Sequence, residues 1–249
     1  MAMSAPSRAV PHMHLVCMDE RFSDAFSAAL AAYEGRLPSC LSVEMHNVAL
    51  QSVPRSAHFD LVVSPANSYG RLDGSFDDAI SRAFAPRDDY HALTHAAQAE
   101  LYREWRGFAP PGTCTLVRIP QHFKERSRNV WGTRYLALCP TMRTPQDVTW
   151  DHEIVYECVW SLLCAIDKHN RALHQRGQSP GDGHADIRSI LITPMATGVG
   201  RVSPERWAHQ FILAVSHFVD AVENPAKWSA LAWHDIDVYT DAMVDSHAM

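Results

Sequence analysis

The sequence predicts an α/β protein in which helices cover both faces of a mostly parallel β-sheet, a three-layer α/β/α arrangement. Short apolar runs alternate with amphipathic stretches along the chain, and this alternation is typical of β-α-β units. The chain has 249 residues, of which 47% are hydrophobic and 20% charged, so it can bury the core of an ordinary globular protein. In such sheets, ligands bind at the loops beyond the carboxyl ends of the strands.

Strands are expected at short apolar runs, and helices where apolar residues recur every three or four positions. The expected strands are residues 13–18, 41–48, 59–64, 114–119, 135–139 and 187–193, with a last edge strand at 236–239. The expected helices are residues 22–33, 76–84, 91–105, 152–169 and 203–219. Residues 175–186 are rich in Gly, Pro and polar side chains and are expected to form an exposed loop. We expect one domain over residues 1–249, with a core at about 12–222 and a C-terminal extension at 223–249.

The charge of the chain limits its partners. The formal net charge is −6 and the basic residues form no run. This argues against long nucleic acids and acidic membranes, since clustered Lys and Arg bind both. A nucleotide is still allowed, because backbone N–H groups alone can bind its phosphates.

Cysteine usage and the absence of targeting signals indicate where the protein works. The six cysteines include no CxxC pair and no zinc-type spacing with histidine. We therefore expect reduced thiols, no metal site and no cofactor. Residues 1–11 lack the apolar run of a signal peptide, and no segment is long enough to span a bilayer. These features favour a soluble monomer of the cytoplasm or nucleus.

Several catalytic motifs are missing from the sequence. None of the 15 histidines belongs to an HExxH motif, and neither a GxSxG nucleophile elbow nor a Walker lysine loop occurs. Cys139 and Arg143 are too close in sequence to hold a phosphate between them, as a cysteine phosphatase would. A buried thiol at a strand end is the better interpretation of Cys139.

Residues 61–80 form the first of two unusual strand-to-helix segments. An apolar strand runs into Ser64-Pro65-Ala66-Asn67, and glycines loosen the chain before a helix begins near Phe76. Taken alone, the segment is better explained as an ordinary turn than as a binding site. In that interpretation Asp73 or Ser75 caps the helix, and the acidic residues of its first turn suit the helix dipole.

Residues 191–211 form the second segment. Gly198-Val199-Gly200 permits close approach of the backbone to a ligand, and Ser203-Pro204 supplies an N-cap followed by proline at the first helical position. Glycine-flanked amides before a helix N-terminus form an anion-binding site. A GxG sequence by itself is weak evidence for a ligand and is better explained as a plain turn.

Together, the order and spacing of these two segments resemble the macro domain family over roughly residues 40–220. The family's first loop is matched by Ser64-Pro65-Ala66-Asn67 followed by Gly74-Ser75-Phe76-Asp77-Asp78-Ala79-Ile80, and its second by Thr197-Gly198-Val199-Gly200. Leu138-Cys139-Pro140-Thr141-Met142-Arg143 is similar to a strand-end segment of one macro-domain-like branch, which also carries Ser-Pro-Ala-Asn-Ser in its first loop. The resemblance implies a macro-domain-like fold with a mixed, largely parallel sheet, and an ADP-ribose-type ligand.

The resemblance also implies roles for individual residues. The first loop would hold the distal ribose, and the second would present N–H groups to the diphosphate. Asn47 occupies the position nearest to the family's adenine-contacting aspartate, and its amide can also hydrogen-bond adenine. Asp73 replaces a glycine of the family, and Arg201 can compensate its charge near the phosphates. The implied ligand-binding residues are Asn47, Ser64, Ala66, Asn67, Gly74, Ser75, Phe76, Thr197, Gly198, Val199, Gly200 and Arg201.

The resemblance implies Asp77 as the catalytic residue, with Asn67 positioning the ribose. A carboxylate at a helix N-terminus keeps a low pKa unless it is buried, which suits orienting a water molecule. The expected function is binding of ADP-ribose or a derivative, with hydrolysis of ADP-ribose 1''-phosphate or of ADP-ribosyl or acetyl-ADP-ribose esters. The alternatives are a non-catalytic reader of ADP-ribose or ADP-ribosylated protein, and a domain for another nucleotide.

Overall fold

Six strands form one sheet whose spatial order differs from their order in the chain. The computed structural model describes residues 10–33, 41–176 and 185–249. The sheet has the order β2-β1-β6-β3-β5-β4, in which β4 is antiparallel to β5 and the other neighbours are parallel. The expected mixed, largely parallel sheet is confirmed. The strands are β1 (His12–Val16), β2 (Val43–His46), β3 (Leu61–Ser64), β4 (Thr115–Arg118), β5 (Tyr135–Leu138) and β6 (Ser189–Ile192).

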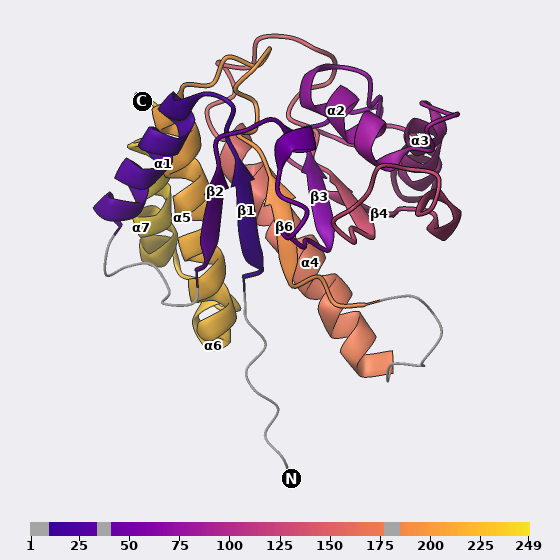
Figure 1. Cartoon of the computed structure of the whole chain (residues 1–249). Coiled ribbons are helices and arrows are strands. Elements are labelled where there is room, and N and C mark those ends of the chain that lie inside the picture. The colour runs from indigo at the N-terminus through magenta and orange to yellow at the C-terminus, as the bar shows by residue number, and fades with distance from the viewer. Residues whose placement is uncertain (1–9, 34–40, 177–184) are drawn as a thin grey trace.

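Helices cover both faces of this sheet, which confirms the three-layer arrangement (Figure 1). Helices α1, α4 and α5 pack on one face, and α2 and α3 pack on the other. Within the described residues, none of the helices is both long and apolar enough to cross a membrane. The helices are α1 (Glu20–Ala32), α2 (Ser75–Phe84), α3 (Ala92–Trp105), α4 (Ile154–Arg176), α5 (Pro204–Glu223), α6 (Pro225–Trp228) and α7 (Trp233–Val244), with short 3₁₀ turns η1 (Leu50–Ser52) and η2 (Gln121–Phe123).

The central strands are apolar throughout because both faces of the sheet are covered. All four residues of β3 are buried. Leu61 and Val63 point into the core beneath α1, α4 and α5, whereas Val62 points into the core beneath α2 and α3. Trp207 of α5 is fully buried in the first of these cores, with its ring 5.8 Å from that of Phe26 in α1. Burial of such large side chains supplies most of the stabilisation of the fold.

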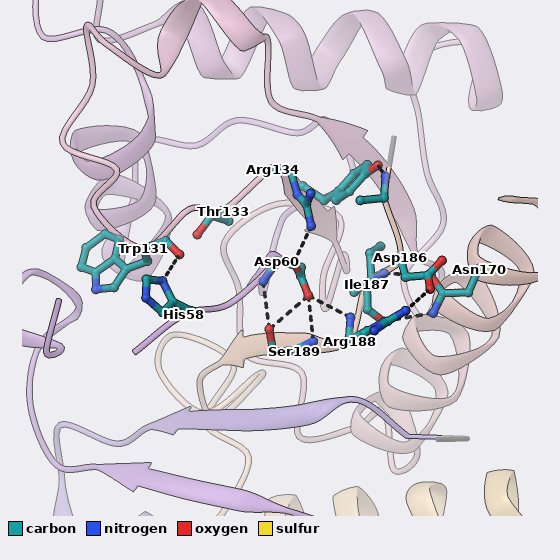
Figure 2. A network of polar contacts seen from close by, with 12 residues as sticks. His58, Asp60, Trp131, Thr133, Arg134, Asn170, Asp186, Ile187, Arg188 and Ser189 are labelled. Atoms are coloured by element: carbon teal, nitrogen blue, oxygen red, sulfur yellow. Dashed lines mark hydrogen bonds and ion pairs between the residues drawn. The ribbon is translucent and has the colours of Figure 1, made fainter. Parts of the chain in front are cut away.

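Asp60 connects the three central strands at their amino ends (Figure 2). Its Oδ2 accepts hydrogen bonds from the backbone N–H groups of Arg188 (2.9 Å) and Ser189 (3.1 Å) and from the Ser189 hydroxyl (3.1 Å). Its Oδ1 accepts one from Arg134 (2.7 Å), and its carbonyl oxygen accepts from the backbone of Arg134 and Tyr135. One residue before β3 therefore fixes the register of both neighbouring strands, β5 and β6.

The predicted edge strand at residues 236–239 is wrong, because these residues lie in α7. The helical repeat places Tyr239 and Met243 on one face of α7. The Tyr239 ring lies 4.6 Å from the Trp228 ring, and its hydroxyl donates to Asp220 of α5. Although burial acts to raise the pKa of Asp220, hydrogen bonds from Tyr239, Trp228 and Lys227 lower it to about 2. This ionised carboxylate holds the two C-terminal helices against α5.

Other expectations differ from the structure mainly in their boundaries. Helix α4 continues to Arg176, beyond the expected end at 169, and residues 177–184 of the expected loop lie outside the described residues. Five of the six cysteines are in described segments, and all five are free thiols. Cys40 lies outside the described residues.

Replacing Asp60 by alanine should destabilise the fold more than replacing an exposed aspartate. Asp60→Ala leaves two backbone N–H groups and a guanidinium without their acceptor, so we expect a loss of about 2–4 kcal/mol in the free energy of unfolding. Urea denaturation followed by circular dichroism measures it. The control is Asp88→Ala, which breaks an exposed pair with Arg126 and should cost less than about 1 kcal/mol. Equal losses in the two variants would contradict the role of Asp60.

Candidate functional site

Two loops that are far apart in sequence leave the sheet side by side. β3 and β6 are parallel neighbours, with Leu61 opposite Ile190 and Val62 opposite Leu191. The first loop (residues 65–74) follows β3, and the second loop (residues 193–203) follows β6. Since the carboxyl ends of parallel strands share one edge, both loops lie where α/β proteins bind ligands.

The second loop presents unpaired backbone donors. Within the described part of the chain, we find no acceptor for the N–H groups of Thr197, Gly198, Val199 and Gly200. The loop is closed behind them by hydrogen bonds from Arg201 N to Gly198 O and from Val202 N to Ala196 O, both 3.1 Å. Consecutive free N–H groups of this kind form an anion-binding site.

Helix α5 begins directly after the second loop. The Ser203 hydroxyl accepts a hydrogen bond from Arg206 N, and Pro204 takes the first helical position, as the sequence predicts. The helix N-terminus adds positive potential to the loop. Ala196 and Arg201 adopt left-handed φ angles of 61° and 60°, which cost a non-glycine residue about 1 kcal/mol or more. The loop thus keeps a strained shape in which Gly198 and Val199 are exposed and Gly200 is buried.

The two glycines of the second loop serve different purposes. A Cβ on Gly200 would meet Ala196 O at 2.4 Å and Val148 Cγ2 at 2.9 Å, so packing requires glycine at this position. A Cβ on Gly198 would meet nothing within 4 Å. Gly198 is exposed and its position is sterically open, as a ligand-binding position needs to be.

In the first loop, the Asn67 side chain is largely used by the loop itself. Its Nδ2 donates to Arg71 O (2.9 Å), and its Oδ1 accepts from Tyr69 N (3.1 Å) and Arg71 N (3.4 Å). A carboxamide has two N–H donors, so one Nδ2 hydrogen is left for a ligand. Ser64 and Ala66 are buried, which places these two residues beneath the surface of the loop.

Asp77, in the first turn of α2, accepts a buried hydrogen bond from the end of β3. The Ser64 hydroxyl, at the end of β3, donates to Asp77 Oδ1 at 2.6 Å. Burial raises the pKa of Asp77 to about 7, although the bond from Ser64 acts to lower it; the charge of Asp73 raises it further. The low pKa expected of an unburied carboxylate at a helix N-terminus therefore does not apply, because this carboxyl group is only 7% exposed. Its Oδ2 has no hydrogen-bond partner among the described residues.

The start of α2 differs from the expected capping by Asp73 or Ser75. The N-cap is Gly74, which has no side chain to form a cap, and Ser75 adopts a φ of 50°. The N–H groups of Gly74, Ser75 and Phe76 find no acceptor within the described segments. Asp73 is paired with Arg71, which offsets the negative charge that Asp73 brings to this loop.

Residues 139–148, which follow β5, connect the two loops. Thr141 N donates to Ala66 O and Ser68 N to Met142 O, both at 3.0 Å, so this segment extends the pairing of β5 with β3. At its other end, Val148 N donates to Gly200 O at 3.0 Å. The sequence did not predict that this bridging segment connects the two loops. Its sequence signal is the similarity of residues 138–143 to a strand-end segment of a macro-domain-like branch.

Asn47 and Arg201 lie at the margins of the two loops. Asn47 is exposed and follows β2, the edge strand, which is separated from β6 by β1. The Arg201 side chain is 75% exposed, and its guanidinium lies 3.8 Å from Asp147 of the bridging segment. An exposed pair of this length is weak, so Arg201 can move toward an anion in the second loop.

Comparisons with known proteins found similarity in structure alone. No protein-family model and no curated protein matches the chain. Among solved structures, it is similar to the Oceanobacillus iheyensis macrodomain with MES bound, with a TM-score of 0.45, 16% identity and coverage of 76% of this chain and 85% of that one. It is also similar to a glycine-to-valine mutant of that macrodomain with ADPR, with a TM-score of 0.35, 13% identity and coverage of 67% and 89%. The chain resembles macrodomains.

The pKa of Asp77 gives the fold a pH dependence of known sign. Folding raises this pKa from its ordinary 3.8 to about 7. The stability that the protonated Asp77 side chain contributes is therefore complete below about pH 4 and is lost as the pH rises toward 7. Asp77→Asn keeps an acceptor for Ser64 and cannot ionise. We expect this variant to match the wild type at pH 4 and to exceed its unfolding free energy at pH 8 by up to about 4 kcal/mol.

Denaturant unfolding at pH 4 and pH 8 measures this difference. Asp78→Asn is the matched control, because hydrogen bonds from Arg82 and Tyr90 lower the pKa of Asp78. This control should gain no stability at pH 8 relative to the wild type. Equal stability of Asp77→Asn and the wild type at pH 8 would show that the Asp77 carboxylate is not buried as described.

Proposed function

We propose that the chain binds ADP-ribose or a close derivative at the carboxyl edge of its sheet. The observation that carries the proposal is the run of four backbone N–H groups, Thr197 to Gly200, without an acceptor in the described structure. A diphosphate supplies the negative charge and the multiple acceptors that such a run requires. The net charge of −6 agrees with binding by backbone donors rather than by a basic surface.

The first loop supplies a second set of donors for the sugar next to the diphosphate. The free N–H groups of Gly74 and Ser75 and the remaining Nδ2 hydrogen of Asn67 suit the oxygens of a ribose. Asn47 follows the edge strand, and its exposed amide can donate to and accept from adenine. The motif resemblance in both loops points to the same ligand.

We also propose that the chain hydrolyses the bound derivative. A carboxyl group with a pKa of about 7 is present in both protonation states at neutral pH, which suits general acid–base chemistry better than an ordinary aspartate. In our proposal Asp77 Oδ2, which has no protein partner in the described residues, receives a proton from the attacking water. The substrate is ADP-ribose 1''-phosphate or an ADP-ribosyl or acetyl-ADP-ribose ester.

One observation favours a non-catalytic reader as the second candidate. Asp77 is 7% exposed and its Oδ1 is bonded to Ser64, so contact with a reacting water requires that water to enter beneath the first loop. A reader of free ADP-ribose or of ADP-ribosylated protein needs only the backbone donors. The two candidates share the binding site and differ in turnover.

Binding is tested by calorimetry with ADP-ribose. Gly198→Glu should weaken binding at least about 100-fold, because it places a carboxylate among the N–H donors at an open position where the fold tolerates a side chain. Val222→Glu adds the same charge at the exposed far end of α5 and should leave the affinity within about twofold. Absence of binding to the folded wild-type chain would overturn the proposed function.

Turnover is tested with ADP-ribose 1''-phosphate, acetyl-ADP-ribose and ADP-ribosylated protein. If the chain is a hydrolase, Asp77→Asn should reduce kcat by about 100-fold or more while ADP-ribose affinity stays within a few-fold. Asp78→Asn, whose side chain pairs with Arg82 and Tyr90, should retain turnover. Binding without turnover of any of the three substrates would establish the reader, and unchanged kcat in Asp77→Asn would exclude Asp77 from catalysis.

A further inference from the structure

Three histidines and a glutamate converge on the free edge of the sheet, away from the two loops. β1 and β2 pair in parallel with His14 opposite Glu44 and Val16 opposite His46. Because side chains alternate along a strand, His12 and His14 point to the same face as Glu44 and His46. These residues come from segments about 30 positions apart in the chain, and only the register of the two strands brings them together.

The ligating atoms of this cluster lie close to the spacing of a metal site. Glu44 Oε2 is 3.5 Å from His14 Nδ1 and 3.9 Å from His12 Nε2, and the donor atoms of these three residues all lie within 4.8 Å of one another. Metal–ligand bonds of 2.0–2.1 Å in a tetrahedral site place neighbouring ligand atoms about 3.3 Å apart. Side-chain shifts of less than an ångström would therefore allow these three atoms to share an ion.

The rings are held in orientations that suit this role. His12 Nδ1 lies 2.9 Å from the Ser42 hydroxyl, so its Nε2 is the nitrogen directed at Glu44. His14 and His46 are buried, at 3% and 7% exposure, and His14 Nδ1 lies 3.0 Å from His46 Nε2. His14 also packs against Phe59, with ring centroids 5.9 Å apart. Ser42 thus fixes the second nitrogen of His12, which is the usual support of a histidine ligand. The nitrogen of His14 that faces Glu44 is the one that also faces His46, so both His14 and His46 direct a nitrogen toward the place of the ion.

We propose that His12, His14 and Glu44 bind a divalent transition-metal ion of the zinc type, with His46 adjacent as a fourth donor. Imidazole nitrogens with one carboxylate match zinc and its neighbours in the first transition row, whereas calcium and magnesium require mostly oxygen ligands. Glu44 is exposed, so an ion can reach the cluster from solvent. The ion would cross-link the edge strand β2 to β1 through Glu44, three residues before Asn47. This proposal does not depend on the proposed function.

Zinc binding is tested on the full 249-residue chain, purified without a histidine tag and freed of metal with a chelator. Calorimetric titration with Zn²⁺ alone should show one saturable equivalent per chain, and titration with Mg²⁺ or Ca²⁺ should show none. Zn²⁺ should also raise the melting temperature, since a ligand that binds the folded state stabilises it. Absence of a saturable equivalent of Zn²⁺ would overturn the proposal.

Two variants test the ligands, chosen because neither leaves a buried cavity. His12→Ala and Glu44→Gln should each weaken Zn²⁺ binding by about tenfold to 100-fold or more and abolish the rise in melting temperature. The control is His247→Ala, which removes a histidine that lies 3.1 Å from Glu153 and stacks on His152. It should bind Zn²⁺ as the wild type does. Wild-type binding by both His12→Ala and Glu44→Gln, or an equal loss in the control, would contradict the assignment.

Discussion

The parallel pairing of β3 with β6 is the constraint on which the candidate site depends. These strands are separated by more than 120 residues, yet Leu61 lies opposite Ile190. A slip of one residue would turn each side chain to the wrong face, and the buried strands allow no such change. Asp60 further fixes the alignment of these two apolar strands, because its carboxylate accepts hydrogen bonds from the backbone N–H groups of Arg188 and Ser189. The amino ends of the strands are thus fixed by hydrogen bonds, which leaves the loops at the carboxyl ends free to serve a ligand.

Several features that destabilise the folded state lie at the carboxyl edge of the sheet. It has unpaired N–H groups in both loops, left-handed φ angles at Ser75, Ala196 and Arg201, and a buried carboxyl group at Asp77. Each of these costs free energy. The two apolar cores on either side of the sheet offset the cost, and residues 139–148 hold both loops in place from one side. Concentrated strain of this kind is expected at binding sites and is hard to explain as a requirement of folding.

Sequence patterns predicted the parts of the molecule that depend on local order. Continuous apolar runs located β3, β5 and β6, and Ser203-Pro204 located the start of α5. The edge strand at 236–239 failed because four residues cannot distinguish a strand from one turn of a helix, and contacts of Tyr239 with Trp228 and Asp220 decide for the helix. The pKa of Asp77 depends on burial beside Ser64, 13 positions away, which periodicity does not reveal.

The cluster of His12, His14, Glu44 and His46 could not be predicted from any single segment, because it forms only when β1 and β2 pair. His12 and His14, like Glu44 and His46, are two residues apart, a spacing that has no meaning as a helical zinc motif but places both side chains on one face of a strand. The link to the candidate site runs through β1, because Thr193, just after β6, donates to Val16 O at 3.1 Å. An ion between β1 and β2 would stiffen the strand that precedes Asn47 and would leave the donors of Thr197 to Gly200 unchanged. The sheet therefore keeps the two proposed sites separable. If both proposals hold, a metal ion would act near Asn47, and anion binding would depend on the second loop.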